Sequence, residues 1–82
     1  DGGVRAGLPR DLAQAMAAQV VAGAATLVAR GDAHPASLKD RVTSPAGTTI
    51  EGIAALETAG FRGTVIAAVT AAARRSAELG RA

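Results

Sequence analysis

Most of the side chains that could bind a small molecule lie in one short segment, residues 39–50, which reads KDRVTSPAGTTI. Hydroxyl groups occur here beside Pro45 and Gly47, whereas the rest of the chain is mostly alanine and aliphatic residues. Proline and glycine interrupt helices, so we expect a loop that leads into a new helix. The first turn of a helix carries unpaired backbone N–H groups and partial positive charge, which together bind anions such as carboxylates. Residues 46–50 are therefore a candidate anion site, although every helix has such an end.

Thr48 and Glu51 have the spacing of a capping box, in which each side chain accepts a hydrogen bond from the other residue's backbone N–H. This pattern predicts that a short helix runs from about Thr49 to Ala59. Gly60 then supplies the left-handed residue that often follows a helix. A second interpretation of the segment stays open, in which Thr48 and Glu51 cap the helix and the loop binds nothing.

Other kinds of chemical site find little support in the sequence. His34 precedes Pro35, a position typical of a polar N-cap or loop residue, and with no cysteine in the chain it has no partners for a zinc site. No serine has the His and Asp companions of a nucleophilic triad. Gly47 follows no strand and belongs to no phosphate-binding glycine pattern. Lys39 and Asp40 are adjacent and so lie on different sides of a helix.

Helices must position this segment, because helical spacing dominates the rest of the chain. Pro9 and Asp11 are typical of a helix start, and Arg30-Gly31 is typical of a helix end, which predicts a first helix over about 9–30. No stretch alternates in the manner of a β-strand. The predicted fold class is all-α, a helical bundle of about four helices, two long and two short. The remaining boundaries predict helices over 35–42, 49–59 and 62–79.

The apolar residues are too small to build an ordinary core. Of the 40 apolar residues 22 are alanine, with one Phe, one Met and no Trp or Tyr. A chain of 82 residues is marginal even with a bulkier core. We therefore expect close helix packing, with Gly23 among alanines allowing a neighbouring helix to approach, and burial against a second copy or another domain.

Charge and hydropathy argue against nucleic acid and membrane partners. The sequence pI of about 10.5 reflects a net charge of only +2 with almost nothing titrating near neutral pH. A helix-turn-helix regulator is disfavoured because its recognition helix, TIEGIAALETA, carries two glutamates and no Lys or Arg. Residues 12–29 lack charge for 18 positions, but their glutamines, threonine and many alanines indicate a buried helix and no membrane span.

Four segments together resemble the C-terminal domain of the pyrroline-5-carboxylate reductase family: DGGVRAGLPRDLA, HPASLKDRVTSPAGTTIEGI, LETAGFRG and AAARRSAELG. The resemblance covers essentially all of residues 1–82. It implies an enzyme that reduces 1-pyrroline-5-carboxylate to L-proline with NADPH or NADH, the last step of proline biosynthesis. It also implies that this chain is the C-terminal helical dimerisation and substrate-binding domain, expected to be inactive alone. The cofactor would be bound mainly by an N-terminal Rossmann domain that this chain lacks.

The resemblance also implies roles for individual residues. Ser44, Gly47, Thr48 and Thr49 match the family positions that hold the substrate carboxylate through backbone amides and hydroxyls. Thr49 matches the threonine whose hydroxyl reaches the pyrroline nitrogen, and it is the candidate catalytic residue. Val42 matches a position that lines the substrate pocket. No residue of the chain is expected to bind the cofactor or a metal.

One departure from the family pattern is Ala46, where many members have glycine, so any amide geometry that needs a left-handed residue there is in question. As partners, the resemblance implies a cytoplasmic homodimer with interlocked helices, or a larger assembly such as a decamer. The competing hypothesis is a purely structural all-α dimerisation module with no ligand site.

Overall fold

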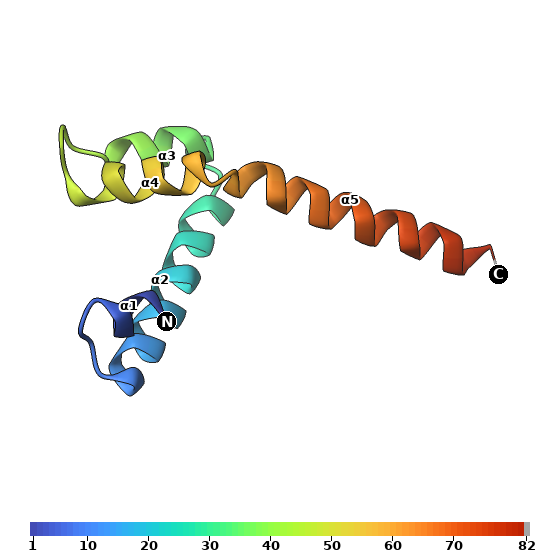
Figure 1. The fold of residues 1–82 in the computed structure, drawn as a ribbon. Helices are drawn as coiled ribbons and strands as arrows, with labels where there is room; N and C mark the ends of the chain where they lie inside the picture. The colour runs from blue at the N-terminus through green and yellow to red at the C-terminus, as the bar shows by residue number, and fades with distance from the viewer. Residues whose placement is uncertain (82) are drawn as a thin grey trace. The chain divides into compact units, whose positions relative to one another are not determined.

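The computed structural model describes residues 1–81, and it folds them into helices and turns without a strand. The all-α prediction is confirmed (Figure 1). Two separate units make up the chain, one formed by Asp1–Arg41 and the other beginning at Val42, and each is described by itself. The helices are α1 (Gly2–Arg5), α2 (Arg10–Ala29), α3 (Pro35–Arg41), α4 (Thr48–Thr58) and α5 (Phe61–Gly80).

Helix α1 was not predicted, because Gly2 and Gly3 are poor helix formers. A tertiary contact explains it: a Cβ added at Gly3 would lie 3.1 Å from Cβ of Ala13 on α2, so glycine lets the two helices approach closely. Ala13 is the one buried residue in the part of the chain that the structure describes, at 8% exposed. The Arg10 guanidinium also pairs with the Asp1 carboxylate at 2.6 Å. Close packing therefore overrides the low helix propensity of the two glycines.

Helix α2 matches the predicted first helix to within one residue at each end. Pro9 lies just before the helix as its N-cap, with φ −57° and ψ 145°, so that Arg10 is the first helical residue in place of Pro9. Asp11 lies in the first turn, where it favours the positive helix end. At the other end Arg30 is the C-cap, as the predicted helix end at Arg30-Gly31 implies, and Gly31 has a left-handed φ of 72°.

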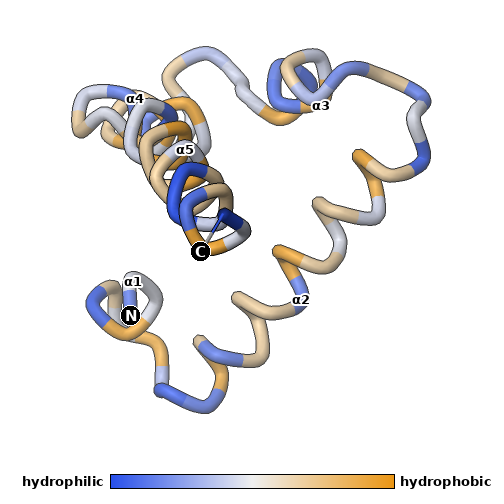
Figure 2. The backbone as a smooth tube through the Cα atoms, turned by 90° about the vertical axis from the view of Figure 1, so that its right-hand side faces the viewer, coloured by the Kyte–Doolittle hydropathy of each residue, from blue (hydrophilic) through white to orange (hydrophobic). Residues whose placement is uncertain are grey.

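The prediction that this first helix is buried is wrong for the chain by itself. Apart from Ala13 the side chains of α2 are exposed, including Val20 at 67% and Val21 at 69%. Figure 2 shows α2 coloured mainly as hydrophobic. By length and composition α2 could cross a membrane, a test that core helices of soluble proteins also pass. The physical reason for the exposure is that α1, the helix that contacts α2 within its unit, has only four residues and covers one face of α2.

Helix α3 begins as predicted and ends one residue early, at Arg41 instead of Val42. The N–H of Ala36 donates to Nδ1 of His34 at 3.1 Å, and the N–H groups of Ser37 and Leu38 donate to the His34 carbonyl oxygen. His34 therefore caps the start of α3, which confirms its interpretation as a polar cap.

Helices α4 and α5 form the second unit and meet at a bend of 52°. Gly60, between them, has φ 76°, so it takes the left-handed conformation predicted for it. Helix α5 begins at Phe61, one residue earlier than predicted, and the Arg62 guanidinium pairs across the bend with the Glu57 carboxylate at 3.0 Å. The apolar residues of α5 are exposed along its length, with Ile66 at 66%.

The exposed area shows how little of the chain is packed. The 8.0 kDa chain leaves 6692 Å² accessible to solvent. Two independent compact units of half that mass would together expose about 5,400 Å². The excess of about 1,300 Å² exceeds the roughly 800 Å² that one partner buries in a standard interface. The prediction of a thin core that needs a further partner is consistent with this area.

Candidate functional site

A tight turn joins Ser44 to Gly47 in the middle of the candidate segment. The N–H of Gly47 donates to the carbonyl oxygen of Ser44 at 3.1 Å, which closes a four-residue β-turn. Pro45 is its second residue, and Ala46 is its third with φ 57°. Proline followed by a left-handed residue is the combination of a type II turn, in which glycine is usual at the third position. The turn therefore forms although position 46 is not glycine, and Ala46 itself adopts the left-handed conformation.

Glycine at position 47 is favoured by its close contact with Ser44 and not by an unusual backbone conformation. Its φ of −79° and ψ of 174° are extended values that any L-residue adopts. A Cβ added to Gly47, however, would collide with the Ser44 hydroxyl oxygen and would lie 3.2 Å from the Ser44 carbonyl oxygen. The structure thereby brings together Ser44 and Gly47, two of the residues predicted for the site.

The predicted capping box does not form. Gly47 is the N-cap of α4, no side chain hydrogen-bonds to the start of this helix, and the first helical bond runs from the N–H of Glu51 to the carbonyl oxygen of Gly47 at 3.3 Å. The helix begins one residue earlier than a Thr48 cap requires, because the extended Gly47 already has the conformation of an N-cap. Glu51 is consequently one position too far along the helix to reach back to the cap residue.

The start of α4 offers backbone donors to a ligand. Thr48, Thr49 and Ile50 are the first three residues of the helix, so their N–H groups have no acceptor within it. Thr48 and Thr49 are exposed, and their hydroxyls belong to the same helical turn as these amides. Partial positive charge at this helix end favours an anion, and the Glu51 carboxylate in the same turn already uses part of it.

Val42 is the predicted site residue that stands apart from this group. It follows the last residue of α3 and precedes Ser44 by two positions. Its side chain is 62% exposed, so within the described residues it lines no closed pocket. The structure therefore groups Ser44, Gly47, Thr48 and Thr49 at the turn and the helix start, and leaves Val42 at the edge.

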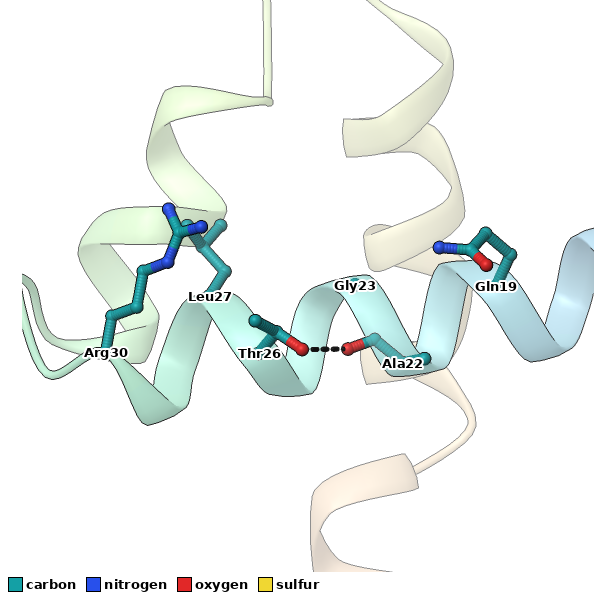
Figure 3. Close-up of a pocket in the computed structure, with 6 residues that line it drawn as sticks. All are labelled: Gln19, Ala22, Gly23, Thr26, Leu27 and Arg30. Carbon is teal, nitrogen blue, oxygen red and sulfur yellow. Dashed lines mark hydrogen bonds between the residues drawn. The ribbon is translucent and has the colours of Figure 1, made fainter.

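A second concave surface, which the sequence analysis did not identify as a whole, runs along one face of α2. Figure 3 shows Gln19, Leu27 and Arg30 extending to one side of the helix, with Gly23 between them. The hydroxyl of Thr26 donates to the carbonyl oxygen of Ala22 at 2.9 Å and is thus turned back onto the helix. The residues that line it recur at helical spacing, a signal present in the sequence: Gln19, Ala22, Gly23, Thr26, Leu27 and Arg30.

Metal chemistry has no ligand set in the part of the chain that the structure describes, where no group of three His, Cys, Asp or Glu side chains converges. The Lys39 ammonium pairs with the neighbouring Asp40 carboxylate at 3.4 Å, so the expectation that these side chains lie apart on different sides of the helix is wrong, because the long lysine side chain reaches its neighbour. The chemistry available at the turn is therefore hydrogen bonding and positioning.

Comparison with known proteins identifies the family. The family model for pyrroline-5-carboxylate reductase dimerisation matches residues 1–79. Pyrroline-5-carboxylate reductase of Glycine max is 62% identical over 79 residues, which are 96% of this chain and 29% of that protein. The Synechocystis enzyme of the same name is 59% identical over 81 residues, which are 99% of this chain and 30% of that protein.

A solved structure agrees with the sequence relatives. The crystal structure of Plasmodium falciparum pyrroline carboxylate reductase with NADP bound superposes with a TM-score of 0.87 at 38% identity, over 93% of this chain and 31% of that one. The chain thus spans about 30% of the length of the relatives it matches. From its sequence match and its helical structure, the chain belongs to the pyrroline-5-carboxylate reductase dimerisation family.

Proposed function

We propose that this chain is the C-terminal helical part of a pyrroline-5-carboxylate reductase, which reduces 1-pyrroline-5-carboxylate to L-proline with NADPH or NADH. In this assignment the chain supplies the subunit interface and the substrate-carboxylate loop. The relatives that carry this name support it, since they match over nearly the whole chain. The localisation we propose is cytoplasmic, with neither nucleic acid nor membrane as a partner.

The observation that carries the proposal is the closed Ser44–Gly47 turn leading directly into the uncapped first turn of α4. This arrangement leaves the amides of Thr48 and Thr49 available to a carboxylate. The Ser44 hydroxyl lies against Gly47 on the same turn. We assign the substrate carboxylate to these donors, the ring nitrogen to the Thr49 hydroxyl, and the ring carbons to Val42.

We propose that the cofactor is bound mainly outside the described residues of this chain. They contain helices and turns, and no strand with a glycine-rich turn precedes any of these helices. We therefore assign NADPH or NADH to another domain of the complete enzyme, where it supplies the hydride. The neighbour with NADP bound, a longer chain, supports that assignment.

The proposed reduction requires of this chain only that it bind and orient the substrate. A protonated cyclic imine is already an electrophile, so its reduction needs a fixed ring more than a strong general acid. Backbone amides hold the carboxylate, and the Thr49 hydroxyl orients the ring through its nitrogen. Thr49 would contribute by orienting the ring and not by transferring a proton.

A homodimer is the assembly we propose, with larger assemblies such as a decamer built from it. The matching family is described as a dimerisation domain. The exposed apolar side chains of α2 and α5 and the excess accessible area supply the surface that a second copy would cover. Interlocking of helices between the two copies would compensate for the thin core.

Titration of the chain with proline, followed by amide chemical shifts, tests the carboxylate site. We expect the amides of Thr48 and Thr49 to shift most, while the amide of Gly60 serves as an internal control. Pyrrolidine, which has the ring without the carboxylate, should leave all three unchanged. If proline moves none of them, the purely structural dimerisation module, which the exposure of Val42 and Thr49 favours, is the better assignment.

A further inference from the structure

Ala46 combines a side chain with a backbone conformation that L-residues rarely adopt. Its φ of 57° makes it the single non-glycine residue with a positive φ among the described residues. In the left-handed conformation the Cβ of an L-residue lies too close to the following carbonyl oxygen. An L-residue therefore populates this conformation about 5- to 30-fold less than glycine does. Such strain persists when surrounding structure enforces it.

Little of the surrounding chain enforces this conformation. Pro45 and Ala46 are both exposed, so no packed core holds the peptide between them. The hydrogen bond from the N–H of Gly47 to the carbonyl oxygen of Ser44 closes the turn, but type I and type II turns both contain it. That bond therefore does not choose between the two forms.

The ends of the turn are better fixed than its middle. Gly47 lies close to the Ser44 hydroxyl oxygen, so that a Cβ there would require the Ser44 side chain to move, and Gly47 is also the N-cap of α4. Type I and type II turns differ mainly by a rotation of about 180° of the central peptide, with ψ of the second residue near −30° or +120°. A change between them is thus confined to the peptide that joins Pro45 to Ala46.

We infer that the Ser44–Gly47 turn is a two-state element, in which the Pro45–Ala46 peptide exchanges between the left-handed type II form seen here and a type I form. Alanine at position 46 keeps the two forms close in free energy, whereas glycine would favour the type II form. The flip exchanges the directions of the Ala46 N–H and the Pro45 carbonyl. A neighbouring anion and a neighbouring cation therefore select opposite forms.

The nuclear Overhauser effect between the Pro45 Hα and the amide proton of residue 46 measures the two populations. This proton pair is close when ψ of Pro45 is near about +120° and distant when it is near about −30°. We expect an intermediate intensity in the unchanged chain and full intensity in Ala46→Gly, a rise of about 5- to 30-fold in the ratio of type II to type I. Ala46→Asn should lie between them, and Ala46→Val below the unchanged chain.

Ala54→Gly, inside α4, is the matched control, because it makes the same chemical change without touching the turn. It should leave the Pro45 signal unchanged. An unchanged chain with the full intensity of Ala46→Gly, or with only the weak intensity of a pure type I turn, would show a single turn form and overturn the inference. These measurements need no ligand and do not depend on the proposed function.

A second arm of the experiment does rest on the proposed carboxylate site. Adding proline to the unchanged chain should move the Pro45 signal towards one form, and pyrrolidine should not. A mixed turn that proline leaves unmoved would support the two-state turn and count against carboxylate binding at this loop. A turn that is single without ligand contradicts the inference whatever proline does.

Discussion

A steric contact with Ser44 constrains which residue fits at position 47 of the turn. Gly47 has φ −79°, which every L-residue tolerates, so alanine would bring no backbone strain. An added Cβ, however, would collide with the Ser44 hydroxyl oxygen and lie 3.2 Å from the Ser44 carbonyl oxygen. Backbone conformation instead constrains position 46, where alanine has a left-handed φ of 57°. Adjacent residues of one loop are therefore constrained by different physical causes.

Gly47→Ala should destabilise the chain, because the new methyl group overpacks against Ser44. We expect a loss of about 1 kcal/mol or more in the free energy of unfolding, measured by chemical denaturation at fixed protein concentration. Ser44→Ala removes the hydroxyl oxygen, so in that background Gly47→Ala should cost distinctly less. The coupling in this double-mutant cycle isolates the contact. Equal costs in both backgrounds would contradict the close approach of Ser44 and Gly47.

Thr49→Val tests the residue assigned to the substrate nitrogen, in the complete reductase. The change keeps shape and volume and removes one hydrogen bond, worth about 1 to 2 kcal/mol. We expect kcat/KM for 1-pyrroline-5-carboxylate to fall about tenfold or more. The KM for NADPH should stay within about twofold, because the nucleotide is assigned to another domain. Kinetics equal to those of the unchanged enzyme would remove Thr49 from the site.

Helix ends were the most predictable elements, since local chemistry sets them. Gly31 was predicted to end a helix and Gly60 to be left-handed, and both follow a helix with a positive φ. Helix α1 and the start of α4 were not predicted correctly, for two different reasons. Helix α1 is stabilised by the close contact of Gly3 with Ala13, which belongs to α2. The turn before α4 makes Gly47 the N-cap of α4 instead of Thr48. Helix propensity alone predicts neither the contact of α1 with Ala13 nor the effect of the turn on the start of α4.

The candidate site, like the helices, was predicted from the sequence only in part. Proline, glycine and hydroxyl residues in one segment indicated a loop leading into a helix, and the structure brings Ser44 to Gly47 as a closed turn. The donors at the start of α4 were expected from the helix end, but their freedom from a side-chain cap was not. Val42, which was expected to line the substrate pocket, is 62% exposed, and its role stays a prediction.

Gly60→Ala should weaken the connection between α4 and α5. Position 60 has φ 76°, so an added Cβ costs about 1 to 2 kcal/mol of stability. The matched control is Gly52→Ala, in the interior of α4, where an added Cβ meets nothing within 4 Å. That change should stabilise by about 0.5 to 1 kcal/mol, because alanine is the better helix former. The two substitutions are chemically identical, and shifts of the same sign in thermal unfolding would contradict the left-handed bend.

At the scale of the whole molecule, exposure of apolar side chains is the dominant feature. Ala13 alone is buried among the described residues, while the valines and leucines of α2 and α5 face solvent. Hydrophobic burial is the main favourable term in folding, so a chain that buries this little is not expected to be stable by itself. Association would supply the missing burial and would make the melting temperature rise with protein concentration. A melting temperature independent of concentration, with a monomeric mass by light scattering, would contradict the proposed homodimer.

The substitution Gly23→Leu tests whether a helix of the second copy packs on the concave face of α2. Leucine and alanine are both better helix formers than glycine, so on an open surface Gly23→Leu and Gly23→Ala would each raise stability by about 0.5 to 1 kcal/mol. Across a close helix–helix contact only a small residue fits, so Leu should lower the dimer mass fraction in sedimentation velocity while Ala changes it much less. Since helix propensity favours both variants, dissociation by Leu has to come from the lost approach between helices. If both variants stay dimeric and gain stability, this face of α2 lies outside the interface.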